Sequence, residues 1–283
     1  MSKSNLHWRS YVQPGRIFGN LYFVGTYAAS SHIIDTGEGL IMIDTGYAEG
    51  AYLILHNIWD LGFCPYDIKY IIHSHGHYDH VGATCAIAKL TGAKTAISRI
   101  DAPMVDGTLV GEGTDIAKGS VDMSLARELE YEFKDFFTPD ILLDDGDVLT
   151  LGNTSIRCVA TPGHTDGTMS FFFDGTDGEK TYRVGTHGGS GTNTQTDDFI
   201  RRYGITTKCR RDYLESIDKL AREHVDIHMG NHVWNNDTDK KLKKLNDDPD
   251  GPNPFVDPEE WGKFLAVRRA AGEKIIAESE LEQ

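Results

Sequence analysis

The densest group of reactive side chains in the 283-residue sequence is one eight-residue segment, His73-Ser-His75-Gly-His77-Tyr-Asp79-His80. Neutral imidazoles together with one carboxylate are the ligands that a borderline divalent cation such as Zn²⁺ prefers. The segment follows a predicted buried strand and precedes a predicted helix, so His75 and His77 can point one way while Asp79 and His80 point to a second, nearby position. The pattern predicts a metal site rather than a solvated His-rich loop.

Three shorter segments carry further candidate groups. A single histidine, His164, lies on a Pro-Gly turn after a predicted strand, and His232 lies just past the predicted strand over 225–229. Asp44 ends an earlier strand and is followed by Thr45-Gly46. Each of these short signals is weak alone, and the two histidines add candidate metal ligands to those of the His-rich segment.

In this order, the segments His75-x-His77-x-Asp79-His80, Pro-Gly-His164-Thr and His232 resemble the metallo-β-lactamase superfamily, over about residues 21–246. The resemblance implies an α/β fold, a four-layer αββα sandwich with two Zn²⁺ ions in a cleft. It assigns His75, His77 and His164 to one zinc, and Asp79, His80 and His232 to the other. Within the superfamily, the sequence is most similar to the third β-lactamase subclass, and Asp44 matches an aspartate that orients ligands.

The resemblance implies a hydrolase in which two zinc ions share a hydroxide that attacks the carbonyl of an amide or ester, and the likeness to the third subclass favours a cyclic one. Asp79 is the residue expected to orient the nucleophile and to pass its proton on. Two departures concern the segment after the predicted strand over 181–185. It lacks the metal-bridging aspartate of other superfamily hydrolases, and His187-Gly-Gly189 stands where third-subclass enzymes have serines. His187 is therefore a candidate metal ligand, oxyanion donor or supporting residue.

Several alternatives share these ligands. A lactonase, or a thioester or ester hydrolase of the same superfamily without β-lactamase activity, differs only in the shape of its pocket. An iron-dependent redox member is disfavoured because its glutamate-bearing ligand pattern is absent from the sequence. A non-enzymatic zinc module is disfavoured because structural zinc sites saturate four ligands, often with cysteine. Manganese or iron could occupy the same set of nitrogen and carboxylate ligands. The substrate and the oligomeric state are not determined by the sequence.

Hydrophobic periodicity and turn residues predict the strands and helices that position these residues. Strands are predicted at 21–25, 30–35, 40–44, 68–74, 94–98, 148–151, 154–160, 168–174, 181–185 and 225–229. Helices are predicted at 48–61, 80–90, 120–133, 208–223, 237–246 and 258–280. We expect one domain over residues 1–283, with a helical extension over about 255–283.

Composition narrows the class of protein. With 28 Lys and Arg against 43 Asp and Glu, the net charge is −15, which disfavours a nucleic-acid-binding surface. The N-terminus lacks the apolar core of a signal peptide and no segment is apolar enough to span a membrane. Four widely spaced cysteines form no CxxC pair, as expected for reduced thiols. We expect a cytoplasmic enzyme acting on a small molecule, without a membrane or nucleic-acid partner.

Overall fold

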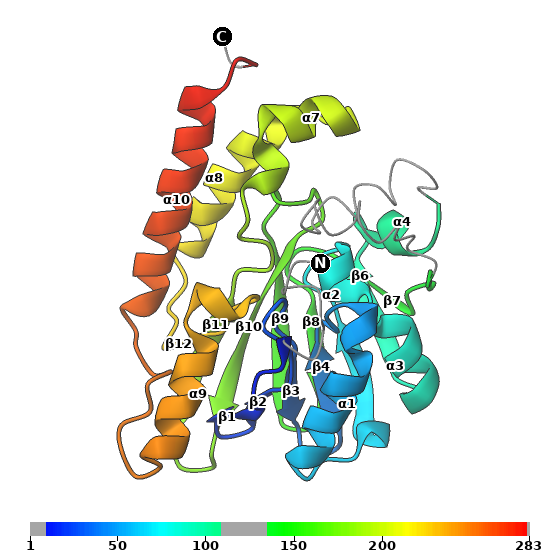
Figure 1. Ribbon diagram of the computed structural model, residues 1–283, viewed down its shortest axis with the longest axis vertical. Coiled ribbons are helices and arrows are strands. Elements are labelled where there is room, and N and C mark those ends of the chain that lie inside the picture. The colour runs from blue at the N-terminus through cyan, green and yellow to red at the C-terminus, as the bar shows by residue number, and fades with distance from the viewer. Residues whose placement is uncertain (1–9, 109–134, 282–283) are drawn as a thin grey trace.

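The computed structural model describes residues 10–108 and 135–281, and two β-sheets form its centre (Figure 1). The first sheet has seven strands in sequential order, antiparallel from β1 to β4 and parallel from β4 to β7. Its strands are β1 (Gly15–Phe18), β2 (Leu21–Phe23), β3 (His32–Asp35), β4 (Leu40–Ile43), β5 (Ile68–Ile72), β6 (Lys94–Ser98) and β7 (Ile141–Leu143).

The second sheet has five strands in the order β12-β11-β10-β9-β8. Its strands pair antiparallel, except that β12 runs parallel to β11. They are β8 (Val148–Leu151), β9 (Thr154–Ala160), β10 (Met169–Thr176), β11 (Thr181–Thr186) and β12 (Ile227–His228). On β10, Phe171 and Phe173 point into the core between the two sheets, whereas Phe172 points to the opposite face. This alternation follows from the two-residue period of a strand.

Helices cover the outer face of each sheet. Ile54 and Ile58 of α1 and Ile87 of α3 pack on the first sheet, while Tyr213 of α8 and Phe264 of α10 pack on the second. The helices are α1 (Ala51–Asp60), α2 (Tyr78–Val81), α3 (Thr84–Thr91), α4 (Ala102–Val105), α7 (Asp197–Tyr203), α8 (Lys208–Leu220), α9 (Thr238–Asp247) and α10 (Glu260–Glu278). The predicted αββα sandwich is confirmed.

Some predicted elements differ from those observed. The single helix predicted over 80–90 is two helices, α2 and α3, separated at Gly82-Ala83. The chain passes so close to another segment at this point that a Cβ on Gly82 would lie 2.7 Å from the backbone nitrogen of Ala48. Strands β1 and β7 and helices α4 and α7 are short elements that the periodicity did not indicate. The helix predicted over 120–133 lies outside the described residues.

The C-terminal helix α10 packs against α8 and against β12. The single domain with a helical extension stays a prediction. Among the described residues, no helix combines the length and the apolar character needed to cross a bilayer.

Beneath α10, the buried ring of His228 lies 4.2 Å from the ring of Phe264 and 5.3 Å from that of Trp261, measured between centroids. Burial, with lesser contributions from Lys241, His187 and Arg268, lowers the pKa of His228 to about 3. An unfolded histidine has a pKa of about 6.5, so below that pH the unfolded state binds more protons than the folded state. The folded state therefore loses stability as the pH falls.

We expect His228 alone to reduce the free energy of unfolding by about 1.4 kcal/mol for each pH unit between roughly pH 6 and pH 3. Urea unfolding of the variant His228→Phe, measured between pH 7.5 and pH 4.5, should show a shallower loss of stability than the native chain. The matched control is His56→Phe, because the side chain of His56 is 58% exposed on α1. An equal pH dependence in the native chain and His228→Phe would contradict the expectation.

Candidate metal centre

The predicted site residues converge where both sheets end. Because β4 and β5 are parallel, their carboxyl ends meet at one edge, and Asp44 and the His-rich segment follow them directly. From the second sheet, His164 lies in the loop between β9 and β10, and His232 lies after β12. Residues far apart in the sequence are thereby brought into one cluster.

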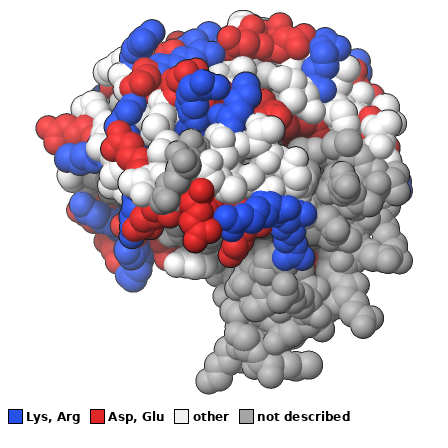
Figure 2. Space-filling view, turned by 90° about the horizontal axis from the view of Figure 1, so that it is seen from above, with Lys and Arg blue, Asp and Glu red and all other residues white. Residues whose placement is uncertain are grey.

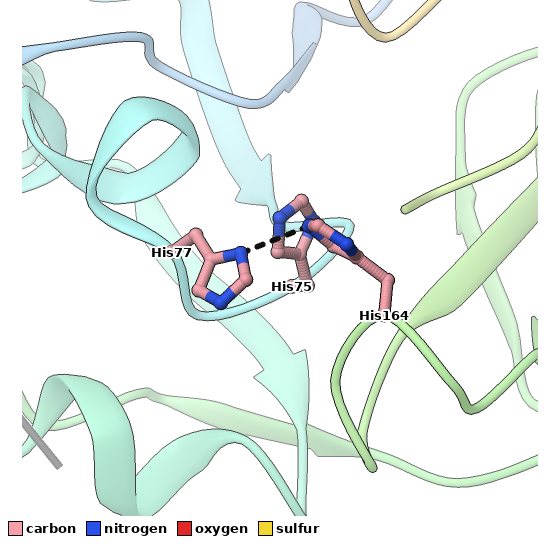
Figure 3. Close-up of side chains that lie close together, drawn as sticks. All are labelled: His75, His77 and His164. Atoms are coloured by element: carbon pink, nitrogen blue, oxygen red, sulfur yellow. Dashed lines mark hydrogen bonds between the residues drawn. The ribbon is translucent and has the colours of Figure 1, made fainter. Parts of the chain in front are cut away.

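The first group consists of His75, His77 and His164, whose rings point toward one another in Figure 3. One ring nitrogen of each lies within 4.8 Å of the others. The closest pair is Nδ1 of His77 and Nε2 of His164, 3.0 Å apart. Two nitrogen ligands of a tetrahedral zinc, with bonds of about 2.05 Å, lie roughly 3.3 Å apart. The spacing is therefore compatible with a shared metal ion.

The second group consists of His75, Asp79 and His80, again with ligand atoms within 4.8 Å. Oδ2 of Asp79 lies 3.5 Å from Nε2 of His80 and 3.8 Å from Nε2 of His232. The rings of His80 and His232 are 5.1 Å apart. The structure thus brings all six predicted ligands together, and His75 belongs to both groups.

Ring nitrogens on the outer side of the cluster are held by protein groups. Four Nδ1 atoms have such contacts: His75 with Ser74 Oγ (3.0 Å), His80 with Asp44 Oδ2 (2.7 Å), His164 with the Gly191 carbonyl (2.8 Å) and His232 with the Ala28 carbonyl (2.8 Å). A carboxylate or carbonyl on one ring nitrogen fixes the tautomer and leaves the other nitrogen's lone pair for a metal.

The inward nitrogens provide the test of fit for a metal. Nε2 of His75 and of His80 is buried, and within the described part of the chain neither has a hydrogen-bond partner. The inward atom of His77 is Nδ1, which faces Nε2 of His164. Buried polar atoms are rarely left unsatisfied, and metal coordination is one of the ways to satisfy an imidazole. The donor set of imidazoles and one carboxylate is also the set that zinc prefers. The residues present therefore fit a metal centre.

Electrostatics keep most of these rings neutral, as metal ligation requires. Burial, together with the charges that the other histidines would carry, lowers the pKa of His75 and His77 well below the usual value. The pKa values of His164 and His232 are lowered to about 4, chiefly by burial. His80 differs: burial lowers its pKa, but the carboxylates of Asp79 and Asp44 outweigh burial, so that its pKa is raised.

Asp44 lies behind the cluster and contacts two neighbouring residues of the motif. Its Oδ1 accepts the backbone N–H of Ser74 (2.8 Å), and its Oδ2 contacts Oγ of Ser74 (2.6 Å) and Nδ1 of His80 (2.7 Å). Burial raises the pKa of this carboxyl, but His80 and His73 outweigh burial and hold it well below the usual range. Asp44 adopts a left-handed backbone conformation with φ of 54°, which is uncommon for a residue other than glycine.

His187 is the one predicted site residue that lies apart from both groups. Its ring packs between the helices on the second sheet, 5.9 Å from the ring of Tyr213 and 6.4 Å from that of Phe264. Its Nδ1 accepts the backbone N–H of Gly189 (3.3 Å), and burial lowers its pKa to about 3. The catalytic role of His187 stays a prediction.

Two features complete the surroundings of the cluster. The indole of Trp234, 52% exposed, stacks on the ring of His232 with 4.4 Å between centroids and 12° between planes. A pocket of about 330 Å³ opens beside His164. Its apolar lining includes Ile100, Met104, Phe199 and Ile205. The indole thus borders His232, and the pocket borders His164.

Sequence reasoning did not identify Asp101, a buried carboxylate that contacts both loops of the first group. Its position at the end of a predicted strand was the only available signal, because its partners are backbone N–H groups and one hydroxyl.

Comparisons with known proteins agree with this geometry. Residues 24–249 match the metallo-beta-lactamase superfamily. The subclass B3 metallo-beta-lactamase BJP-1 of Bradyrhizobium japonicum is similar, with 26% identity, a TM-score of 0.81 and 96% of each chain covered. The class B3 di-zinc metallo-beta-lactamase LRA-12 from an Alaskan soil metagenome has 30% identity and a TM-score of 0.78, over 97% of this chain and 98% of that one.

A hydroxyacylglutathione hydrolase of Anaeromyxobacter dehalogenans is 28% identical over 38% of this chain and 29% of its own length. The chain thus spans under a third of the length of that curated relative. The superfamily match, by contrast, covers most of the sequence. The chain belongs to the metallo-beta-lactamase superfamily.

Proposed function

We propose that the chain is a dinuclear zinc hydrolase that opens an amide or ester bond of a carboxylic-acid derivative, with a cyclic, β-lactamase-like substrate as the favoured case. The observation that carries the proposal is the set of ring nitrogens that face one another in the cluster. Nε2 of His75 and of His80 is buried without a hydrogen-bond partner within the described residues, and Nδ1 of His77 faces Nε2 of His164. His75, His77 and His164 would hold one ion, and Asp79, His80 and His232 the other. The similar LRA-12 enzyme is described as di-zinc.

Zinc at such a centre acts as a Lewis acid and lowers the pKa of bound water from 15.7 to about 7. The side chains contribute orientation and proton transfer. The buried carboxylate of Asp79 lies beside His80 and His232, where it would accept a proton from a nucleophilic water and pass it on. Asp44 and Ser74 keep His80 and His75 in the orientation that presents Nε2 inward.

Of the three roles considered for His187, its position supports that of a supporting residue rather than a metal ligand or an oxyanion donor. A Cβ on the neighbouring Gly189 would lie 2.7 Å from Cδ2 of His164, so this segment packs tightly against a ligand. By accepting the N–H of Gly189, His187 would hold that segment in place. Its contribution would thus be to position His164 rather than to contact the substrate.

The partners proposed are small molecules rather than nucleic acids. The net charge is −15, and on the described part of the face in Figure 2, Lys and Arg side chains are interspersed with Asp and Glu. The apolar pocket beside His164 suits a substrate that carries an apolar substituent. A cytoplasmic location is supported by the four cysteines, all of which are free thiols.

The test is turnover of three chromogenic substrates, a cephalosporin, a lactone and an aryl thioester, by the zinc-loaded protein. We expect efficient ring opening of the cephalosporin that is lost on chelation and restored by Zn²⁺. The alternative, supported by the match to a hydroxyacylglutathione hydrolase, is a lactonase or thioester hydrolase without β-lactamase activity. Turnover of the lactone or thioester with an inert cephalosporin would establish that alternative. Inertness toward all three would contradict the hydrolase proposal.

A further inference from the structure

A buried carboxylate, Asp101, links the two loops that supply the first group of ligands. It is 2% exposed and follows β6. Its Oδ2 accepts the backbone N–H of Gly76 (2.9 Å) and the hydroxyl of Thr165 (2.7 Å), and its Oδ1 accepts the backbone N–H of Gly167 (2.9 Å). No Lys or Arg forms an ion pair with it among the described residues.

The groups that donate hydrogen bonds to Asp101 lie next to the first group of ligands. Gly76 separates His75 from His77, whereas Thr165 and Gly167 follow His164. The two loops belong to different sheets and are about ninety residues apart in the sequence. Asp101 comes from a third segment and is bonded to both. It contacts no ligand side chain through these bonds, so any effect on the ligands passes through the backbone.

Packing around Asp101 leaves little freedom to either loop. A Cβ on Gly167 would lie 2.4 Å from Oδ1 of Asp101 and 2.3 Å from Oγ of Ser98. A Cβ on Gly76 would lie 2.9 Å from Cβ of Met104. Contacts this short are tolerated only at glycine, so both loops are held close to the carboxylate and to each other.

Such an arrangement is costly for the fold, because burial without a cationic partner disfavours a carboxylate. Burial raises the pKa of Asp101 to about 6, and the hydrogen bonds from Thr165, Gly76 and Gly167 oppose that rise. An apolar residue would fill the same space without this cost. The contacts are therefore better explained by the loops that they hold than by stability alone.

We propose that Asp101 is a positioning residue that fixes the spacing of His75, His77 and His164 and so sets the metal affinity of the first group, an inference that rests on the proposed dinuclear centre. Ligands arranged in advance lose less free energy on binding an ion, and outer contacts of this kind are worth about 10–100-fold in metal affinity. The other ion, whose proposed ligand His80 contacts Asp44 instead, should be affected much less.

The experiment compares the native chain with Asp101→Asn, in which shape is retained. Whichever way the amide is turned, its NH₂ group faces the N–H of Gly76 or of Gly167, so one backbone donor loses its acceptor. Zinc affinity is measured by competition with a chromophoric chelator at two equivalents of Zn²⁺, and the ligand field by the visible spectrum after one equivalent of Co²⁺. Asp140→Asn is the matched control, because Asp140 accepts the N–H and hydroxyl of Thr95 at the other end of β6.

We expect Asp101→Asn to lower the affinity for one of the two zinc ions by about 10–100-fold and to change the Co²⁺ spectrum. The affinity for the other ion should stay within about threefold of the native value. Thr165→Val removes one of the hydrogen bonds to Asp101, that from the Thr165 hydroxyl. This variant should lower the affinity for the same zinc ion by a smaller factor. Urea unfolding of the metal-free chains separates folding from binding. Unchanged zinc affinities and an unchanged Co²⁺ spectrum would overturn the inference. An equal loss of affinity for both ions, in proportion to a loss in the free energy of unfolding, would also overturn it. If the native chain itself binds no zinc, the proposed function fails instead.

Discussion

The variant His75→Ala is expected to lose at least about 10³-fold in turnover and to bind less than two equivalents of zinc. His75 is a proposed ligand of one ion, and its ligand atom also lies within 4.8 Å of those of Asp79 and His80, so its loss opens the coordination of that ion and removes a close neighbour of the other. A metal centre contributes several kcal/mol of transition-state stabilisation, and each 1.36 kcal/mol is tenfold in rate. Turnover of the preferred chromogenic substrate and zinc content after dialysis are the measurements.

His56→Ala is the matched control, because His56 is exposed on α1, where its Nε2 lies 3.4 Å from Oδ2 of Asp60. This variant should keep two zinc ions and turnover within about twofold of the native chain, as expected for a surface substitution. A His75→Ala variant with full zinc content and native turnover would show that the cluster is not the reaction centre.

The ligand cluster could be predicted from the sequence for a physical reason. Four of its six members lie within six residues, from His75 to His80, and a segment that joins a buried strand to a helix has few possible conformations. The turn residues Pro162 and Gly163 likewise indicated that His164 lies on a loop at the end of a strand. The αββα sandwich followed from the same pattern of strands and helices, together with the resemblance that the motif carries.

Other features depend on contacts that leave no local pattern. The sequence alone does not distinguish Asp101 from an ordinary turn residue. Its contacts are with backbone N–H groups of two loops that are distant in the sequence. His187 has the residue type of a ligand, yet the helices α8 and α10 that pack on the second sheet enclose its ring. At the break between α2 and α3, the carbonyl of His80 accepts the N–H of Thr45, and the N–H of Ala83 donates to the carbonyl of Gly46. Periodicity within one element contains no information about such neighbours.

The variant Asp79→Asn is expected to lower turnover by about 10²–10⁴-fold, the usual contribution of a general acid or base. Asn keeps the size of the side chain and one oxygen that can still contact a metal, but it lacks the negative charge and cannot accept a proton. The neighbouring Nε2 atoms of His80 and His232, at 3.5 Å and 3.8 Å, lose an anionic partner. The pKa of His80, which Asp79 helps to raise, should fall as a result.

Zinc content distinguishes the two roles that Asp79 combines. If the variant retains two zinc ions while turnover falls, the lost function is proton transfer. If it retains one ion, the lost function is ligation of the second metal. Asp60→Asn, on the exposed surface of α1, is the control and should match the native chain in both measurements. Native turnover in Asp79→Asn would contradict both roles. Because the substitution removes both the proton acceptor and a charged ligand, we expect both functions to be impaired, with the loss in turnover exceeding the loss of metal.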